Sequence, residues 1–183
     1  MRARHTVSGM NTTAPTPSTA TSSTSTSSTP TPTGSLAIVN VFVFTNDTDA
    51  SVAFYRDVLG CATHTDVTNG DFRWVTLTPP TQPELEIVLH NYTGGGAMPM
   101  SGSDAEALHD LLAKGLLSAL IFRVDDVDAV FEHVRASGAQ VLQEPQDQFY
   151  GVRDCAFRDP VGNMVRFNQA LPADRVPSAD WQN

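Results

Sequence analysis

The sequence contains the same run of segments twice, and this repeat limits the folds open to the chain. Each half begins with a β-branched and aromatic run, continues through an amphipathic helical segment that ends at a glycine, and closes with three more strand-like runs. Asp47 and Asp125 precede the two helical segments and are 78 residues apart, and Gly60 and Gly138 end them at the same spacing. The pattern predicts two copies of a βαβββ unit.

In the first half, Val52, Tyr55 and Val58 recur at helical spacing after a capping residue at Thr48 or Asp49. The dipeptide Asn69-Gly70 is typical of a hairpin turn. The predicted strands are Leu36–Phe44, Cys61–Val67, Phe72–Thr78 and Glu84–His90.

The second half follows residues 91–115, which we interpret as a connector with a short helix from Asp104 to Lys114. Within it, Gly94–Met100 has the composition of an adaptable flap, with a plain linker as the equal alternative. A strand Leu116–Val124 and a helix beginning at Asp125-Asp126 come next. The remaining predicted strands are Gln140–Gln143, Val152–Arg158 and Met164–Gln169.

Two such units define an α+β protein with a curved sheet. Each unit has one helix, which can cover only one face of its sheet, so two concave faces remain to enclose a ligand. The predicted domain spans 35–170, with module one at about 36–92, a connector at 93–115 and module two at about 116–169.

The ends of the chain differ from this domain. From Asn11 to Thr33, 20 of 23 residues are Ser, Thr or Pro, which offer almost no apolar surface to offset the entropy of ordering. We therefore predict a disordered tail at 1–34, and a C-terminal arm at 171–183. Met10 is an alternative start to Met1.

Charge and composition exclude several functions. Without the two arginines of the tail, 9 basic residues face 20 acidic ones, a net charge of −11 that would repel a phosphate backbone. No apolar run is long enough to cross a membrane, and the first residues lack the apolar core of a secretory signal. Cys61 and Cys155 have no metal-binding spacing, and free, partly buried thiols of a soluble cytoplasmic protein are expected.

The stretch Asp159-Pro160-Val161-Gly162-Asn163 has the residue preferences of a type I turn between two strands. Together with Ala53-Phe54-Tyr55, Val58-Leu59-Gly60 and Phe122–Val127, this motif resembles the vicinal oxygen chelate superfamily, which includes glyoxalase I, bleomycin-resistance proteins and extradiol dioxygenases. The resemblance covers about residues 36–169.

In catalytic members of that superfamily, His, Gln or Glu on the concave strands holds a metal ion. The resemblance places the ligands at Asn40, at Ser118 or Ala119, and at Arg166, three residues after Asn163. Asn, Ser and Ala are poor ligands for a divalent ion, and a cation at 166 would repel it. Only Glu86 could stand near the remaining position. The sequence thus predicts no metal and no cofactor.

Several residues on the concave strands are candidates for ligand binding. Phe42 and Phe44 would form an apolar wall for a flat ligand, or belong to the core. Arg73 and Asp154 would approach each other across the cavity if Pro79 is aligned with Pro160. The full predicted ligand-binding set is Asn40, Phe42, Phe44, Arg73, Trp74, Val88, Ala119, Asp154, Met164 and Arg166.

Glu86 and His90 would face the cavity two residues apart, as an acid–base pair or as residues of an exposed rim. Arg166 needs an anion, either Glu86 in a structural ion pair or a carboxylate, phosphonate or phenolate of the ligand.

The sequence favours a metal-free, homodimeric protein that binds a small, partly aromatic or anionic molecule, as antibiotic-sequestering proteins do. The alternative is a metal-independent isomerase or lyase that uses Glu86 or His90 as acid–base and Arg166 to stabilise an oxyanion. A metal-dependent lyase or dioxygenase is the third possibility.

Overall fold

A computed structural model describes residues 36–94 and 100–176 of the chain. The predicted tail at 1–34, most of the Gly94–Met100 segment and the last part of the C-terminal arm lie outside these residues. All described helices and strands belong to one compact unit, Ala37–Asn183.

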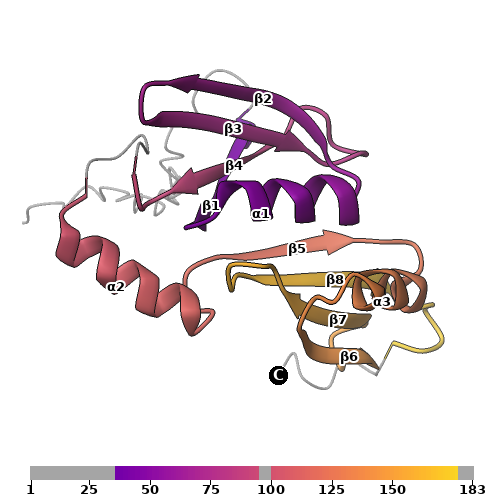
Figure 1. Cartoon of the computed structure of the whole chain (residues 1–183). Helices are drawn as coiled ribbons and strands as arrows, with labels where there is room; N and C mark the ends of the chain where they lie inside the picture. Colours follow the sequence, from indigo (N-terminus) through magenta and orange to yellow (C-terminus); the bar gives the residue numbers. More distant parts are fainter. Residues whose placement is uncertain (1–35, 95–99, 177–183) are drawn as a thin grey trace, which may run out of the picture. The chain divides into compact units, whose positions relative to one another are not determined.

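The βαβββ repeat is confirmed by two four-stranded sheets of identical topology (Figure 1). The first has the order β1-β4-β3-β2 and the second β5-β8-β7-β6, and in each the first strand runs parallel to the fourth. The strands of module one are β1 (Asn40–Thr45), β2 (Ala62–Asn69), β3 (Phe72–Thr78) and β4 (Glu86–Asn91). Those of module two are β5 (Ala119–Arg123), β6 (Val141–Asp147), β7 (Val152–Arg158) and β8 (Met164–Ala170).

Two strand boundaries differ from the prediction by four residues, and the others by three or fewer. Leu36 to Val39 precede β1 and are exposed, because β4 begins only at Glu86, whose N–H donates to the Val39 carbonyl at 2.8 Å. β6 continues to Asp147, past Pro145, where the sequence indicated an end. The pairing of β6 with β7 is irregular between Gln143 and Gln146, and this irregularity accommodates the proline, which has no N–H to donate.

The helical segment of module one is one residue longer than that of module two. In module one, α1 (Thr48–Ala53) continues directly into a turn of π-helix, η1 (Phe54–Val58), whereas α3 (Val127–Ala136) is regular. Asp47 caps α1 and Asp126 caps α3, so the caps lie 79 residues apart while the closing glycines lie 78 apart. The extra residue of module one is taken up by the π-turn. Asp126, rather than Asp125, is therefore the equivalent of Asp47.

The core lies on the helix-facing side of both sheets. Val43, Leu77 and Ile87 of module one are buried in the same cluster as Phe157 and Val165 of module two. The opposite side of each first strand is open, since Phe42 is 49% exposed and Ile121 62% exposed.

The turn at Asp159 joins the modules. Oδ1 of Asp159 accepts hydrogen bonds from the backbone N–H groups of Val161, Gly162 and Asn163, and Oδ2 accepts from the Tyr55 hydroxyl at 3.2 Å and from Nδ2 of Asn163 at 2.8 Å. Nδ2 of Asn163 also donates to the Phe44 carbonyl at 2.9 Å. Burial raises the pKa of Asp159 despite these donors, and burial likewise raises that of Tyr55.

The connector helix α2 (Gly102–Ala113) packs against the same turn. Gly162 has a φ of +117°, and a Cβ there would lie 2.5 Å from the Leu112 carbonyl oxygen, so the turn requires glycine for two reasons. Arg158 donates to the carbonyls of Gly162 and Lys114 and fixes the end of the connector.

Among the described helices, none combines the length and apolar character needed to span a membrane.

We expect Tyr55→Phe to lower the free energy of unfolding by about 1–2 kcal/mol, because the buried Asp159 carboxylate loses a donor. Urea denaturation of Tyr55→Phe, Asp159→Asn and the double variant measures this. The two changes should be non-additive by at least about 0.5 kcal/mol. Additive effects, or an unchanged midpoint for Tyr55→Phe, would contradict the role of this contact.

Candidate functional site

The strand registers bring equivalent positions of the two modules to their open faces. On β4, Val88 lies opposite Phe42 of β1, and on β8, Arg166 lies opposite Ile121 of β5. By the same register, Trp74 corresponds to Asp154 and His90 to Asn168. Module one is thus aromatic and apolar where module two is charged and polar.

The open face of module one, which we call the aromatic face, consists of Phe42, Phe44, Trp74 and His90. The ring of Phe42 meets those of Trp74 and His90 edge-on, each with a centroid distance of 6.2 Å, and Phe44 meets His90 at 5.4 Å. His90 is 2% exposed, and its buried Nε2 has no hydrogen-bond partner in the described residues. Burial lowers the pKa of His90, which favours the neutral ring.

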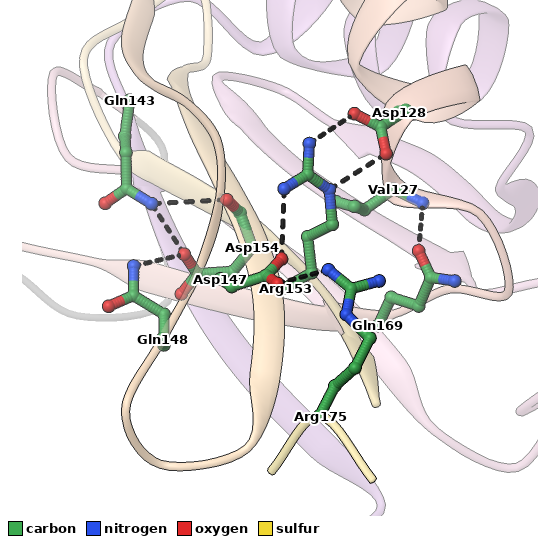
Figure 2. A network of polar contacts seen from close by, with 9 residues as sticks. All are labelled: Val127, Asp128, Gln143, Asp147, Gln148, Arg153, Asp154, Gln169 and Arg175. Atoms are coloured by element: carbon green, nitrogen blue, oxygen red, sulfur yellow. Dashed lines mark hydrogen bonds and ion pairs between the residues drawn. The ribbon is translucent and has the colours of Figure 1, made fainter. Parts of the chain in front are cut away.

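The open face of module two, which we call the polar face, is organised around Asp154 (Figure 2). This carboxylate is completely buried. Its Oδ1 accepts from Nε2 of Gln143 at 2.5 Å and of Gln148 at 2.8 Å, and its Oδ2 accepts from the Tyr150 hydroxyl at 2.9 Å and from Nη1 of Arg166 at 2.5 Å. Burial alone would raise the pKa of Asp154, but these four donors together hold it below its usual value.

The Arg166 side chain is 20% exposed. Nη1 donates to Asp154 and, at 3.3 Å, to Oε1 of Gln143. Because Asp154 neutralises its charge, Arg166 forms a net neutral pair rather than an isolated cation.

Comparison with known proteins identifies the fold and the family. Residues 37–167 match the model of the Glyoxalase/Bleomycin resistance protein/Dioxygenase superfamily. The chain belongs to this superfamily. The curated protein YurT of Bacillus subtilis (strain 168), itself uncharacterised, is 27% identical over 124 residues, which are 67% of this chain and 91% of YurT.

Two solved structures of similar proteins cover most of the domain. UcmS2 is 30% identical with a TM-score of 0.66, and the match covers 74% of this chain and 98% of UcmS2. TnmS3, described as an antibiotic binding protein from Streptomyces sp. CB03234, is 25% identical with a TM-score of 0.56, over 74% of this chain and 96% of TnmS3.

The residues at the superfamily's metal positions do not fit a metal ion. Asn40 and Ala119 open β1 and β5, each seven residues before a helix cap, so Ala119 rather than Ser118 is the second equivalent position. Position 166 on β8 carries the paired arginine, and its equivalent on β4 is Val88, not Glu86. Within residues 36–94 and 100–176, no three His, Cys, Asp or Glu side chains come together as a possible metal site.

Two predicted ion pairs are wrong. Glu86 does not partner Arg166, because Oε1 of Glu86 lies 3.2 Å from Nδ1 of His64 on β2 while Arg166 bonds to Asp154. Arg73 does not pair with Asp154 either, because Arg73 binds Asp49 and Asp66.

Arg73 binds Asp49 and Asp66, and its equivalent Arg153 binds Asp128 and Asp147, so each module has the same surface cluster. Figure 2 shows the Arg153 cluster, in which Arg175 also reaches Asp147. An alignment of Pro79 with Pro160 places module two one residue out of register with module one. In that alignment Asp154 corresponds to Arg73, whereas the strand pairing shows that it corresponds to Trp74.

The other predicted ligand residues are distributed over both faces. Asn40 pairs with Glu86 and Ala119 with Met164 at one end of the parallel strand pairs, and Val88 is fully buried between Phe42 and Thr76. The structure contains cavities of about 820 Å³ and about 1010 Å³, and neither is lined by any predicted ligand residue.

Sequence reasoning missed four members of the polar face: Gln143, Gln148, Tyr150 and Asn168. Gln143 has the parity of the open face on β6, which was a usable signal, but Gln148 and Tyr150 lie in the following loop. No strand periodicity applies to a loop.

We expect Arg166→Met to lower the free energy of unfolding by about 3 kcal/mol at pH 7, because it leaves a buried anion without its cation. The pKa of Asp154 is depressed in the folded protein, so the pair's contribution is complete above the unfolded pKa of about 3.9 and disappears as pH falls through the folded pKa. The deficit of the variant should therefore shrink on acidification.

Chemical denaturation between pH 3 and pH 7 tests this expectation. Arg135→Met is the matched control, because the Arg135 pair with Glu132 is exposed and should contribute less than about 1 kcal/mol. Equal losses for the two variants, or a deficit that is independent of pH, would contradict the account.

Proposed function

We propose that this protein is a metal-independent binding protein for a small, flat, partly aromatic molecule. The aromatic face receives the ring system of the ligand, and the polar face around Arg166 binds its oxygen substituents. In this role the protein sequesters its ligand, in the manner of antibiotic-binding resistance proteins.

The observation that carries the proposal is the exposure of a sheet face rich in aromatic side chains. Phe42 keeps 49% of its surface exposed although Val43, its neighbour on β1, is fully buried on the other side of the sheet. Exposed aromatic surface on a concave sheet is costly in water and favours stacking with an apolar partner. Phe72 and Trp74, stacked at 6.5 Å, extend the same surface along β3.

Two buried polar atoms support a ligand that forms hydrogen bonds. Nε2 of His90 and Oδ1 of Asn168 occupy equivalent positions in the two modules, and both lack a partner in the described residues. Buried polar atoms without partners cost free energy, which a ligand with matching groups would recover. Oγ1 of Thr76, which has the same parity as Trp74 on β3, is another such atom, so the side of the aromatic face has two and the polar face has one.

The Arg166–Asp154 pair widens the class of ligand beyond the anions expected from the sequence. Since the pair is neutral overall, it does not demand a fully ionised ligand, and carbonyl, phenol or carboxylate oxygens are all acceptable partners for the guanidinium N–H groups other than those of Nη1, which bonds Asp154 and Gln143. The anionic ligand expected from the sequence is one member of this wider class.

Metal independence is supported by chemistry at the superfamily's metal positions. Asn40, Ala119 and Val88 supply at most one weak oxygen donor, and Arg166 brings a positive charge. We derive no catalytic step through a metal ion.

A homodimer would bring two open faces together. Within the described residues, β1 and β5 are edge strands, each paired on one side only. Ile121 of β5 is 62% exposed, and burying it against a second copy would also close the face that contains Arg166. Sedimentation equilibrium that gave the mass of a single chain at micromolar concentration would contradict the dimer.

Similarity to TnmS3, whose description is an antibiotic binding protein, supports a binding role over a catalytic one. The alternative of an isomerase or lyase is less well supported, because Glu86, one of its two proposed acid–base residues, is engaged by His64. A cytoplasmic location stays a prediction.

Trp74 provides a direct test of the aromatic face. The chain has two tryptophans, so Trp181→Phe leaves Trp74 as the sole indole reporter. We expect anthraquinone-2-carboxylate, a flat aromatic probe, to quench this emission saturably at one molecule per site. Phe42→Ala in the same background should weaken binding by about tenfold, since it removes a ring of the binding surface.

Leu142→Ala is the control, because Leu142 is an exposed apolar side chain of β6 with the parity opposite to Gln143. It should leave the affinity unchanged. Quenching that does not saturate, or that Phe42→Ala and Leu142→Ala affect equally, would exclude the aromatic face as the binding surface.

A further inference from the structure

We infer that the cavity of about 1010 Å³ beside α3 and β5 is a second binding site, for a neutral and mainly apolar small molecule that donates a hydrogen bond. Its walls come from several parts of one chain. The cavity is lined by Val41 of β1, by residues 120–123 of β5 and the following Val124, by Val130, His133 and Val134 of α3, by residues 57–61 at the end of η1 and by the loop 79–82.

The cavity marks an incomplete part of the core. Eight hydrophobic residues pack against the buried core but remain partly exposed, and all except Ala139 line this cavity: Val41, Val58, Leu59, Leu120, Phe122, Val124 and Val130. Their open sides face one shared space of the size that drug-sized ligands fill. An apolar occupant would complete the core at this place and remove that surface from water.

His133 supplies one directed polar contact. Its Nε2 lies 2.9 Å from the Val58 carbonyl oxygen, which can only accept, so Nε2 carries the hydrogen. In the neutral ring, Nδ1 is then the acceptor that this wall offers. A hydroxyl or N–H group on the ligand matches it.

The remaining lining groups favour an uncharged ligand. Asp57 is already bonded by Nε and Nη2 of Arg56. Burial raises the pKa of the Cys61 thiol to about 11, so this wall is neutral at pH 7. Arg123 is exposed at the rim. No buried, unpaired charge among the described lining residues calls for a counter-ion.

This site is independent of the aromatic face. Val41 and Phe42 are neighbours on β1 and point to opposite sides of the sheet, and Ile87 and Val88 do the same on β4. A substitution that abolishes binding at one site is therefore expected to leave binding at the other unchanged. A small molecule suits the space better than a second copy of the chain, because strand, helix and loop residues of one chain surround it from several directions.

N-phenyl-1-naphthylamine tests the inference, because it is neutral, apolar, carries one N–H donor and becomes strongly fluorescent in apolar surroundings. We expect one molecule to bind per chain of the full-length protein. Val130→Trp fills the cavity and should reduce the affinity by at least about tenfold. His133→Phe removes the acceptor while keeping a ring, and should weaken binding by about fivefold.

Ala129→Trp is the matched control, since Ala129 is exposed on the same helix and does not line the cavity. Ala129→Trp and Phe42→Ala should both leave the affinity unchanged. Absence of saturable binding to the wild-type protein would overturn the inference. If Phe42→Ala loses binding while Val130→Trp keeps it, the probe binds to the aromatic face and not to the cavity. If the probe does not bind and Val130→Trp changes the oligomeric state, the cavity is instead occupied by a second copy of the chain.

Discussion

The hydrogen bonds around the Asp159 carboxylate hold the two modules in one arrangement. Five donors surround this buried group, four of them from its own turn and one, the Tyr55 hydroxyl, from the π-turn of the other module. Asn163 of the same turn donates to Phe44 on β1, so the turn fixes a strand as well as a helix of module one. Because β8 leaves this turn directly, the position of Arg166 depends on it.

The two modules share a topology and differ in the chemistry of their open faces. Val88, His90 and Trp74 of module one correspond to Arg166, Asn168 and Asp154 of module two. A buried carboxylate with four donors stabilises the arginine at the position where the superfamily's metal-binding members have a ligand. In the function that we propose, an aromatic wall and a polar wall, rather than a metal ion, bind the ligand.

The sequence predicted the repeat, the element order and the turn at Asp159, because hydrophobic periodicity, helix caps and turn residues act locally. It also predicted that Arg166 needs an anion. It did not identify Asp154 as that anion, because the choice depends on the β7–β8 register and on a loop that brings Gln148 and Tyr150 to the same carboxylate. Nor did strand parity indicate the cavity behind β1, which arises from how the modules pack.

The metal content of the purified full-length protein tests the central claim most directly. The protein is incubated with excess Zn²⁺, Mn²⁺ or Ni²⁺ and dialysed, and its metal content is then measured by inductively coupled plasma mass spectrometry. The double variant Arg166→Glu/Asn40→His, which supplies two metal ligands, is treated in the same way for comparison. We predict far less than one ion per chain in the wild-type protein. A stoichiometric ion in the wild-type protein that is lost when Glu86 or His90 is substituted would contradict the account.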